Sequence, residues 1–174
     1  KLINIARFTD QKDHLTLLKG INKIKDKIKI KLLIIGYGSN KTIIKKYIFE
    51  NGLKKIVKVI NYQDNPYKYL SLSDCLILTS LFEGLPNVIM EALCLKKFVI
   101  STNCPTGPKE ILLNGKYGSL FRIKDYNQLS TLILKYYQNK KLFHKKTING
   151  FKSLNRFDYE NNCKKYLKVI EESL

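Results

Sequence analysis

The stretch CLILTSLFEGLPNVIMEAL, from Cys75 to Leu93, contains the pattern that decides the fold. It begins with a continuous apolar run that ends at Thr79, and such a run predicts a strand buried on both faces of a sheet. A turn at residues 83–84 follows. Pro86 is placed for a first helical position, and the residues from Asn87 onward follow a helical pattern. A strand that leads through a short turn into a helix is the unit of a parallel α/β sheet.

The same alternation extends outward in both directions along the chain. Further apolar runs predict strands at Leu2–Ile5, Ile30–Ile35, Ile56–Ile60 and Phe98–Ser101, with a last extended piece at Gly118–Ile123. Helical spacing predicts apolar faces at Leu15, Leu18, Ile21 and Ile24; at Ile43, Ile44, Tyr47 and Ile48; in Tyr67–Leu72; at Val88, Ala92 and Leu95; and at Tyr159, Cys163, Tyr166, Leu167 and Ile170. We therefore expect one α/β domain over residues 1–174, a Rossmann-like, doubly wound parallel sheet with a helical C-terminal end.

Composition narrows the classes of function. The 174 residues include 32 lysines and arginines against 14 acidic residues, a net charge of +18. Only three of the basic residues are arginines, the side chain that reads base edges bidentately, so nucleic acid is not an expected partner. Most lysines are expected on a solvated surface, with attraction to an anionic membrane as the second interpretation. The 44% hydrophobic content excludes a disordered tail, and no apolar run approaches the roughly 18 residues of a membrane span.

The four cysteines show no CxxC spacing and no histidine at zinc-site intervals, so neither a disulfide framework nor a metal site is expected. They are Cys75, Cys94, Cys104 and Cys163, and the first two lie in apolar segments, where we expect small buried hydrophobes. Free cysteines without a disulfide framework are typical of proteins in the reducing cytoplasm. The chain opens without an initiator Met or a signal-peptide pattern, so we expect it to begin inside a longer protein.

The start of the helix at Asn87 is the first candidate binding site. Its unpaired N–H groups and the helix dipole suit an anion such as a phosphate, and Gly84 would let a ligand approach the backbone. Glu83 precedes the helix, and Glu91 lies about 7.5 Å along the axis past Pro86. Two carboxylates so placed would accept hydrogen bonds from hydroxyls at both ends of a nucleotide sugar. Alternatively, Glu83 is an ordinary first-turn acid and Glu91 an exposed helix residue.

The segment EGLPNVIME, residues 83–91, resembles the E-x7-E motif of the retaining GT-B glycosyltransferases of the large bacterial glycan-assembly family called group 1. Other segments are similar to family motifs in the expected order: ARFTDQKDH (6–14), LLIIGYGS (32–39), SLSDCLILTS (71–80), NCPTGPKEIL (103–112) and NGKYGSLF (114–121). The resemblance covers nearly the whole chain. It implies the C-terminal, donor-binding lobe of the fold, without the acceptor-binding N-terminal domain, so that the chain alone would bind a donor but scarcely transfer its sugar.

The resemblance also implies roles for individual residues. Arg7 and Lys12 match the basic pair that holds the donor diphosphate and offsets charge on the leaving nucleotide. Glu83 matches the acid that binds hydroxyls of the donor sugar, and Glu91 matches the one that holds the ribose. Catalytic roles are thus expected for Glu83, Arg7 and Lys12. Further donor contacts are expected from Gly36, Gly38, Tyr62 beside the base, and the residues Gly84, Leu85, Asn87 and Val88.

Three residues have weaker assignments, and one departs from the family pattern. Ala6 stands where the family usually has Gly, which narrows the approach to the phosphates. His14 is expected on the surface at a helix start, with an approach to a phosphate as the alternative, and His144 is expected to face solvent. Glu110 either caps its local helix or matches a family acid near the donor. Because no Asp-x-Asp occurs in the sequence, we expect no metal and no cofactor beyond the donor.

The expected function is transfer of a sugar, with retention, from a nucleotide donor to a glycan or lipid-linked acceptor of surface polysaccharide, lipopolysaccharide or glycan biosynthesis. A UDP-sugar is the favoured donor, and the acceptor would be held by the N-terminal domain. The alternatives are a sugar-nucleotide epimerase of the same fold and a non-catalytic basic module that binds nucleic acid or a partner protein. The expected location is the cytoplasm, with peripheral contact at the cytoplasmic face of the inner membrane.

Overall fold

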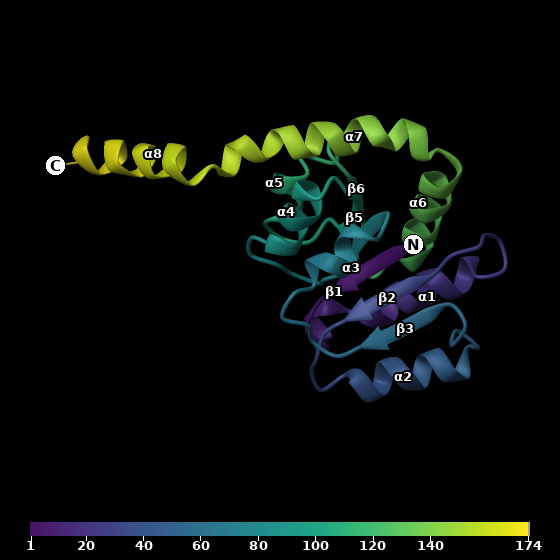
Figure 1. The fold of residues 1–174 in the computed structure, drawn as a ribbon. Helices are drawn as coiled ribbons and strands as arrows, with labels where there is room; N and C mark the ends of the chain where they lie inside the picture. Colours follow the sequence, from purple (N-terminus) through teal and green to yellow (C-terminus); the bar gives the residue numbers. More distant parts are fainter. Residues whose placement is uncertain (174) are drawn as a thin grey trace.

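Six parallel strands form one sheet at the centre of the molecule (Figure 1). The computed structural model describes residues 1–173. The strands are β1 (Leu2–Ile5), β2 (Leu32–Ile35), β3 (Val57–Ile60), β4 (Cys75–Leu78), β5 (Phe98–Thr102) and β6 (Ser119–Phe121). Their order is β3-β2-β1-β4-β5-β6, and every neighbouring pair is parallel. The predicted parallel sheet is confirmed: β1 has the predicted bounds, and the ends of the other strands differ from the predicted ones by at most two residues.

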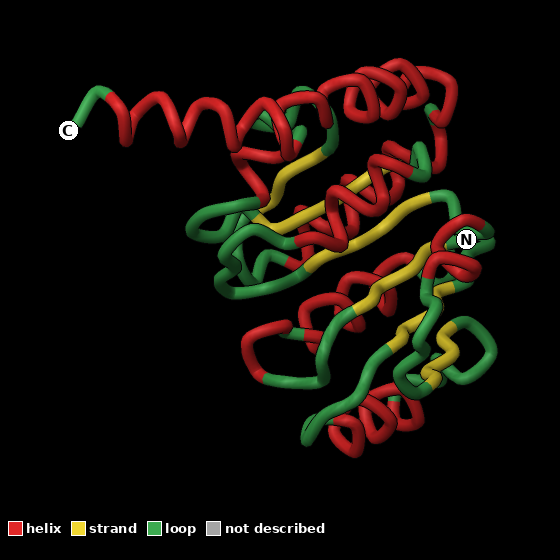
Figure 2. Tube along the Cα trace, turned by 60° about the vertical axis from the view of Figure 1, so that its left-hand side comes forward, coloured by secondary structure: helices red, strands yellow, loops and turns green. Residues whose placement is uncertain are grey.

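Eight α-helices and two short 3₁₀ helices are present among the described residues. The α-helices are α1 (His14–Ile24), α2 (Lys41–Glu50), α3 (Tyr67–Ser71), α4 (Asn87–Cys94), α5 (Pro108–Ile111), α6 (Tyr126–Gln138), α7 (Lys140–Lys152) and α8 (Tyr159–Glu171), and the 3₁₀ helices are η1 (Asp10–Lys12) and η2 (Ser153–Phe157). Figure 2 shows helices on both sides of the layer of strands. No helix within residues 1–173 combines the length and apolar character needed to cross a membrane.

Two separate hydrophobic cores flank the sheet. On one face the buried side chains come from α1, α2 and α6, for example Leu18, Ile44 and Leu129. On the other face they come from α3, α4 and α5, for example Leu70 and Ile89. Apolar side chains on both faces of the strands fill these cores, which is why the strands are continuous apolar runs. The doubly wound arrangement predicted from the sequence is therefore confirmed.

The α4 helix packs by a different set of residues than its sequence pattern predicted. It begins at Asn87 with Pro86 as the N-cap residue, so Pro86 lies one position earlier than expected. The buried residues of the helix are Ile89, Ala92 and Leu93, whereas Val88 and Leu95 are only partly buried. Cys94 at its end is exposed, so the expectation of a buried cysteine there is wrong. Six of the eight residues of the helix are apolar, so the spacing of apolar residues does not by itself select the face that packs on the sheet.

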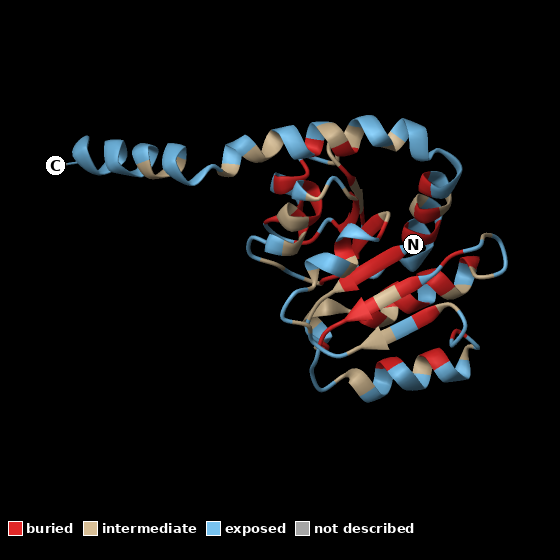
Figure 3. Ribbon diagram, in the orientation of Figure 1, coloured by how far each residue is buried: buried red, intermediate tan, exposed pale blue. Residues whose placement is uncertain are grey.

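The C-terminal helix α8 extends away from the rest of the molecule (Figure 1). None of its residues is buried, and none belongs to either core cluster. Figure 3 shows it exposed along most of its length. Its predicted apolar face is present as a helix face, but Tyr159 and Tyr166 on that face are 80% and 73% exposed.

Candidate functional site

The candidate site lies at the carboxyl ends of β1 and β4, which are neighbours in the middle of the sheet. The chain leaves β1 toward α1 on one face and leaves β4 toward α4 on the other face. The connections therefore diverge at this point and leave a crevice between them, the place where ligands bind in open α/β sheets. The loop after β1 contains Arg7 and Lys12, and the loop after β4 contains Glu83.

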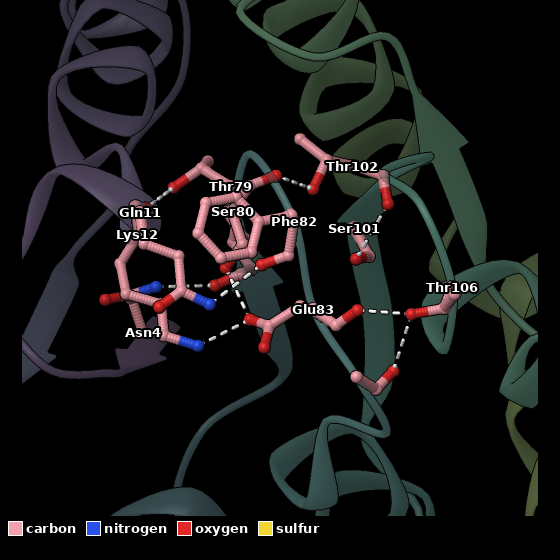
Figure 4. Close-up of polar contacts among 12 residues, drawn as sticks. Asn4, Gln11, Lys12, Thr79, Ser80, Phe82, Glu83, Ser101, Thr102 and Thr106 are labelled. Carbon is pink, nitrogen blue, oxygen red and sulfur yellow. Dashed lines mark hydrogen bonds and ion pairs between the residues drawn. The ribbon is translucent and has the colours of Figure 1, made fainter.

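Lys12 and Glu83 form a nearly buried ion pair across this crevice (Figure 4). Lys12 Nζ lies 2.6 Å from Glu83 Oε1, and the two side chains are only 15% and 7% exposed. The hydroxyl of buried Ser80 donates a hydrogen bond to the same oxygen, also at 2.6 Å. Glu83 Oε2 has no hydrogen-bond partner within the described residues. The structure thus joins two of the predicted catalytic residues and leaves one carboxylate oxygen free.

Several hydrogen bonds tie the two loops together. The backbone N–H of Leu81 donates to the carbonyl of Gln11, whose side-chain amide donates to the carbonyl of Phe82. Thr79 Oγ1 donates to the carbonyl of Lys12 at 2.9 Å. These bonds join the two loops at positions directly beside Lys12 and Glu83. They therefore fix the ion pair through the backbone as well as through the side chains.

The loop after β5 supports the turn at residues 83–84 from the other side, and Figure 4 shows Glu83 between Lys12 and Thr106. Thr106 Oγ1 donates a hydrogen bond to the carbonyl of Glu83. Thr102 Oγ1 donates to the carbonyl of Ser80 at 2.7 Å. Neither threonine was predicted from the sequence, because a threonine at the end of a strand or in the loop after it carries no distinctive signal.

The α4 N-terminus faces the same crevice without a side-chain cap. Pro86 has no N–H, and no side chain accepts from the first amides of the helix. Gly84, Leu85 and Asn87 are exposed, and Val88 is partly buried. A Cβ atom on Gly84 would meet nothing within 4 Å, so the space in front of this turn is open. The geometry fits an anion bound by backbone amides, as the sequence indicated.

Glu91 lies one helical turn further along α4 and contacts a tyrosine from α3. The Tyr67 hydroxyl donates to Glu91 Oε1 at 3.3 Å. The negative charge of Glu91 raises the pKa of Tyr67, because a neighbouring carboxylate disfavours the phenolate. Glu91 therefore lies at the edge of the site in a partly buried position, separate from the Lys12–Glu83 pair.

A small pocket of about 280 Å³ adjoins Arg7. Its lining residues include Ala6, Gly36 and Tyr62, as well as Tyr37, which the sequence interpretation missed. Tyr37 and Tyr62 meet edge to face with ring centroids 5.8 Å apart, and both are 58% exposed. Arg7 is exposed and has no ion pair or side-chain hydrogen bond within residues 1–173. An aromatic pair beside a free guanidinium fits a flat, anionic ligand such as a nucleotide.

The two predicted loop glycines are required by packing. A Cβ on Gly36 would lie 1.9 Å from the carbonyl oxygen of Ala6, and one on Gly38 would lie 2.5 Å from that of Phe8. Gly38 also has φ of +143°, which other residues rarely adopt. Both glycines therefore allow the loop after β2 to lie directly against the loop that contains Arg7. In this way they fix the wall of the pocket.

The expectation that His14 lies on the surface is wrong. The imidazole is 3% exposed, packs edge to face on Phe8, and has no hydrogen-bond partner for either nitrogen. Burial lowers the pKa of His14 to about 4, so the ring is neutral at pH 7. The reason is that Asp13, in the left-handed region at φ of 40°, turns the chain and directs the first residue of α1 inward. His144 is exposed, as predicted.

Glu110 is exposed, and no side chain caps the short α5 helix, so the capping assignment is not supported. The four cysteines are free thiols, and burial raises the pKa of Cys104 near the site. Within the described part of the chain, no group of three or more His, Cys, Asp or Glu side chains is arranged to hold a metal ion.

Comparison with known proteins gives consistent matches. The family model described as glycosyl transferases group 1 matches residues 1–171. An uncharacterized glycosyltransferase of Methanocaldococcus jannaschii, MJ1059, is 34% identical over an alignment that covers 99% of this chain and 50% of the relative. A Campylobacter jejuni relative, named as an N-acetylgalactosamine-N,N'-diacetylbacillosaminyl-diphospho-undecaprenol 4-alpha-N-acetylgalactosaminyltransferase, is 27% identical over 74% of this chain and 34% of its own length. The chain thus spans half or less of these curated relatives.

Solved structures share the fold. TarM of S. aureus, in a complex that includes UDP, superposes with a TM-score of 0.89 at 24% identity, covering 97% of this chain and 35% of that one. Anabaena HepE in complex with UDP superposes with a TM-score of 0.87 at 17% identity, covering 98% of this chain and 48% of that one. At these identities the likeness shows the fold alone.

Proposed function

The chain belongs to the glycosyl transferases group 1 family, and on that premise we propose that it is the nucleotide-sugar-binding lobe of a glycosyltransferase. The observation that carries the proposal is the cluster of Lys12, Glu83 and Ser80 beside the uncapped N-terminus of α4. Arg7, in the same loop as Lys12, lines the pocket that contains Tyr37 and Tyr62. This arrangement offers cations and amides for a diphosphate, a free carboxylate oxygen for sugar hydroxyls and aromatic rings for a base.

The proposed donor is a UDP-sugar. Relatives of the fold were solved with UDP, which supports this choice of nucleotide. Arg7 and Lys12 would bind the diphosphate. A lysine ammonium has three N–H donors, so Lys12 can keep its bond to Glu83 and still donate to a phosphate oxygen. Glu83 would bind the sugar, Glu91 the ribose, and Tyr62 with Tyr37 the base.

The proposed chemistry follows from these positions. As the bond between the anomeric carbon and the diphosphate oxygen breaks, negative charge builds on the leaving nucleotide. The fixed charges of Arg7 and Lys12 would stabilise that charge without needing to reorganise. We propose that transfer proceeds with retention at the anomeric carbon, as the sequence resemblance implies. The acceptor would be a glycan or a lipid-linked saccharide, held by residues outside this chain at the cytoplasmic face of a membrane.

Isothermal titration calorimetry tests the donor assignment. The 174-residue chain is titrated with UDP, GDP, ADP and their sugar conjugates, and UDP is expected to bind most tightly. Glu91→Gln is expected to weaken UDP binding about fivefold, because a hydrogen bond to the ribose is lost. Glu50→Gln, an exposed substitution on α2, is the matched control and should leave the affinity unchanged. Absence of binding by all three nucleotides would overturn the proposal.

A further inference from the structure

Thr106, in the loop after β5, has a backbone conformation that threonine rarely adopts. Its φ is +58°, in the left-handed region, and its side chain is β-branched. A β-branched residue in this region is strained, so the surrounding structure must stabilise it. A glycine or asparagine would adopt the same backbone with less strain. The presence of threonine therefore points to a use for its hydroxyl group.

That hydroxyl binds the backbone of the turn that contains Glu83. Thr106 Oγ1 donates to the carbonyl of Glu83 and lies 3.3 Å from the carbonyl oxygen of Gly84. The next residue, Gly107, lies so close that a Cβ there would be 2.0 Å from Gly84 O and 2.4 Å from Pro86 Cδ. The loop after β5 is thus in direct contact with the turn, and the hydroxyl fixes its carbonyl groups.

The carboxylate of Glu83 is fixed separately. Ser80 Oγ and Lys12 Nζ both bind Oε1, each at 2.6 Å, and Ser80 is itself held by Thr102 Oγ1 through its carbonyl. With Oε1 occupied, only Oε2 is available to a ligand. One hydroxyl therefore fixes the backbone of Glu83, and another fixes the rotation of its carboxylate.

We propose that Thr106 and Ser80 are positioning residues that hold Glu83 so that its Oε2 accepts hydrogen bonds from hydroxyls of the donor sugar. The proposal rests on the donor-binding function proposed above. Neither residue lines the pocket beside Arg7, where the base is proposed to bind. Their main effect is therefore expected on the sugar, and the affinity difference between a UDP-sugar and UDP reports on it.

The test compares UDP with UDP-glucose and UDP-N-acetylglucosamine in calorimetric titrations of the 174-residue chain. Thr106→Val removes the hydroxyl but keeps the branched shape, and Ser80→Ala removes the second hydroxyl. Each variant is expected to bind the preferred UDP-sugar about five- to tenfold more weakly, which is the effect of one hydrogen bond. Its affinity for UDP should change less than twofold. Thr106→Ser keeps the hydroxyl and is expected to restore binding. Thr131→Val, whose hydroxyl bonds only within α6, is the matched control.

The outcomes separate the two proposals. If neither the wild-type chain nor any variant binds UDP or a UDP-sugar, the proposed donor-binding function is wrong, and so is the positioning role that rests on it. If UDP binds normally but both variants bind the UDP-sugar as the unmodified chain does, the positioning role is wrong and the function stands. Equal losses for UDP and UDP-sugar would show a general structural role, as would failure of Thr106→Ser to restore binding. A wild-type chain that binds no UDP-sugar more tightly than UDP would also overturn the positioning role.

Discussion

At the scale of single residues, the site contains one cation that is already engaged and one that is free. Lys12 is held by Glu83, whereas Arg7 is exposed and has no ion pair among the described residues. A free guanidinium at the mouth of a pocket has no intramolecular bond to break when an anion arrives. Removal of Arg7 should therefore affect ligand binding alone, whereas removal of Lys12 would also break an internal ion pair.

Arg7→Ala is expected to weaken UDP binding at least tenfold, because a hydrogen bond between charged groups contributes about 1.5 to 3 kcal/mol. Thermal stability should be unchanged, since no internal contact is lost. Calorimetric titration at low and moderate salt measures the effect, which should shrink as salt rises. Arg122→Ala is the matched control, because Arg122 is also exposed, lies in a loop after a strand and makes no side-chain bond within residues 1–173. Equal losses in both variants would indicate non-specific attraction.

His14 predicts a pH dependence of stability. Burial lowers the pKa of His14 from 6.5 to about 4 in the folded chain, so the unfolded chain binds the extra proton between these values. Stability should therefore fall as pH decreases from 6.5 toward 4. Between pH 7.5 and 4.5 this one group is expected to lower the free energy of unfolding by about 2 to 3 kcal/mol, because roughly 1.4 kcal/mol is lost per pH unit between 6.5 and 4.5.

Urea unfolding of the wild-type chain and of His14→Leu at both pH values isolates that contribution, because the carboxylates titrate alike in the two proteins. On acidification, the free energy of unfolding of His14→Leu should fall by about 2 to 3 kcal/mol less than that of the wild-type chain. A matched control is His144→Leu, which replaces an exposed histidine and should retain the wild-type pH dependence. Identical pH profiles for wild type and His14→Leu would contradict a neutral, buried ring.

At the scale of elements, the strands could be predicted because burial on both faces requires an unbroken apolar run. Cys75–Leu78 and Phe98–Thr102 are buried at every position, as strands covered on both faces of a sheet are. The helix faces were harder. Periodicity selects a face only when polar residues mark the opposite side, and six of the eight residues of α4 are apolar, so the pattern did not single out Ile89 and Leu93 as core residues.

The site could be predicted only in part. Glu83 and Glu91 were singled out by their positions before and along the predicted helix, and Arg7 and Lys12 by the resemblance to the basic pair of the family. Ser80, Thr106 and Tyr37 were missed, because small hydroxyls and loop tyrosines are common and acquire meaning only through contacts between segments far apart in the sequence. Thr106 and Glu83 are 23 positions apart, and no local pattern relates them.

The same substitution should destabilise the fold at one glycine of the strand-to-helix connections and leave stability unchanged at another. Gly36→Ala is expected to destabilise the fold by about 2 kcal/mol or more, because its Cβ would lie 1.9 Å from a backbone oxygen. Gly84→Ala should leave stability within about 0.5 kcal/mol, because its Cβ meets nothing. Thermal and urea unfolding measure the stability of both variants. Comparable losses for the two variants would contradict the close contact between the loops after β1 and β2.

At the scale of the whole molecule, the site lies between the two connections that lead to the two cores. The loop after β1 leads into α1 and the first core, and the loop after β4 leads into α4 and the second. The hydrogen bonds between Gln11, Leu81 and Phe82 connect these halves at the crevice. Ligand binding there would contact both halves of the domain, so it should raise the stability of the whole domain.

The helix α8 stands outside this cooperative unit. It has no buried residue, and its apolar side chains Tyr166, Leu167 and Ile170 are each more than half exposed. The hydrophobic contribution to stability comes from area removed from water, and α8 removes almost none. A chain shortened to residues 1–157 is therefore expected to keep its melting temperature within about 2 °C and to bind UDP as before.

Differential scanning calorimetry and UDP titration of residues 1–157 check this expectation. Circular dichroism should show the loss of α8 alone, because α7 keeps its buried residues Thr147 and Gly150 against the domain. Shortening the chain to residues 1–139 is the contrasting control. It also removes α7, whose Phe143 packs against buried Phe98 and Tyr136, and should lower the melting temperature clearly. If removal of α8 alone destabilised the domain as much as removal of both helices, α8 would have to pack on the domain in solution.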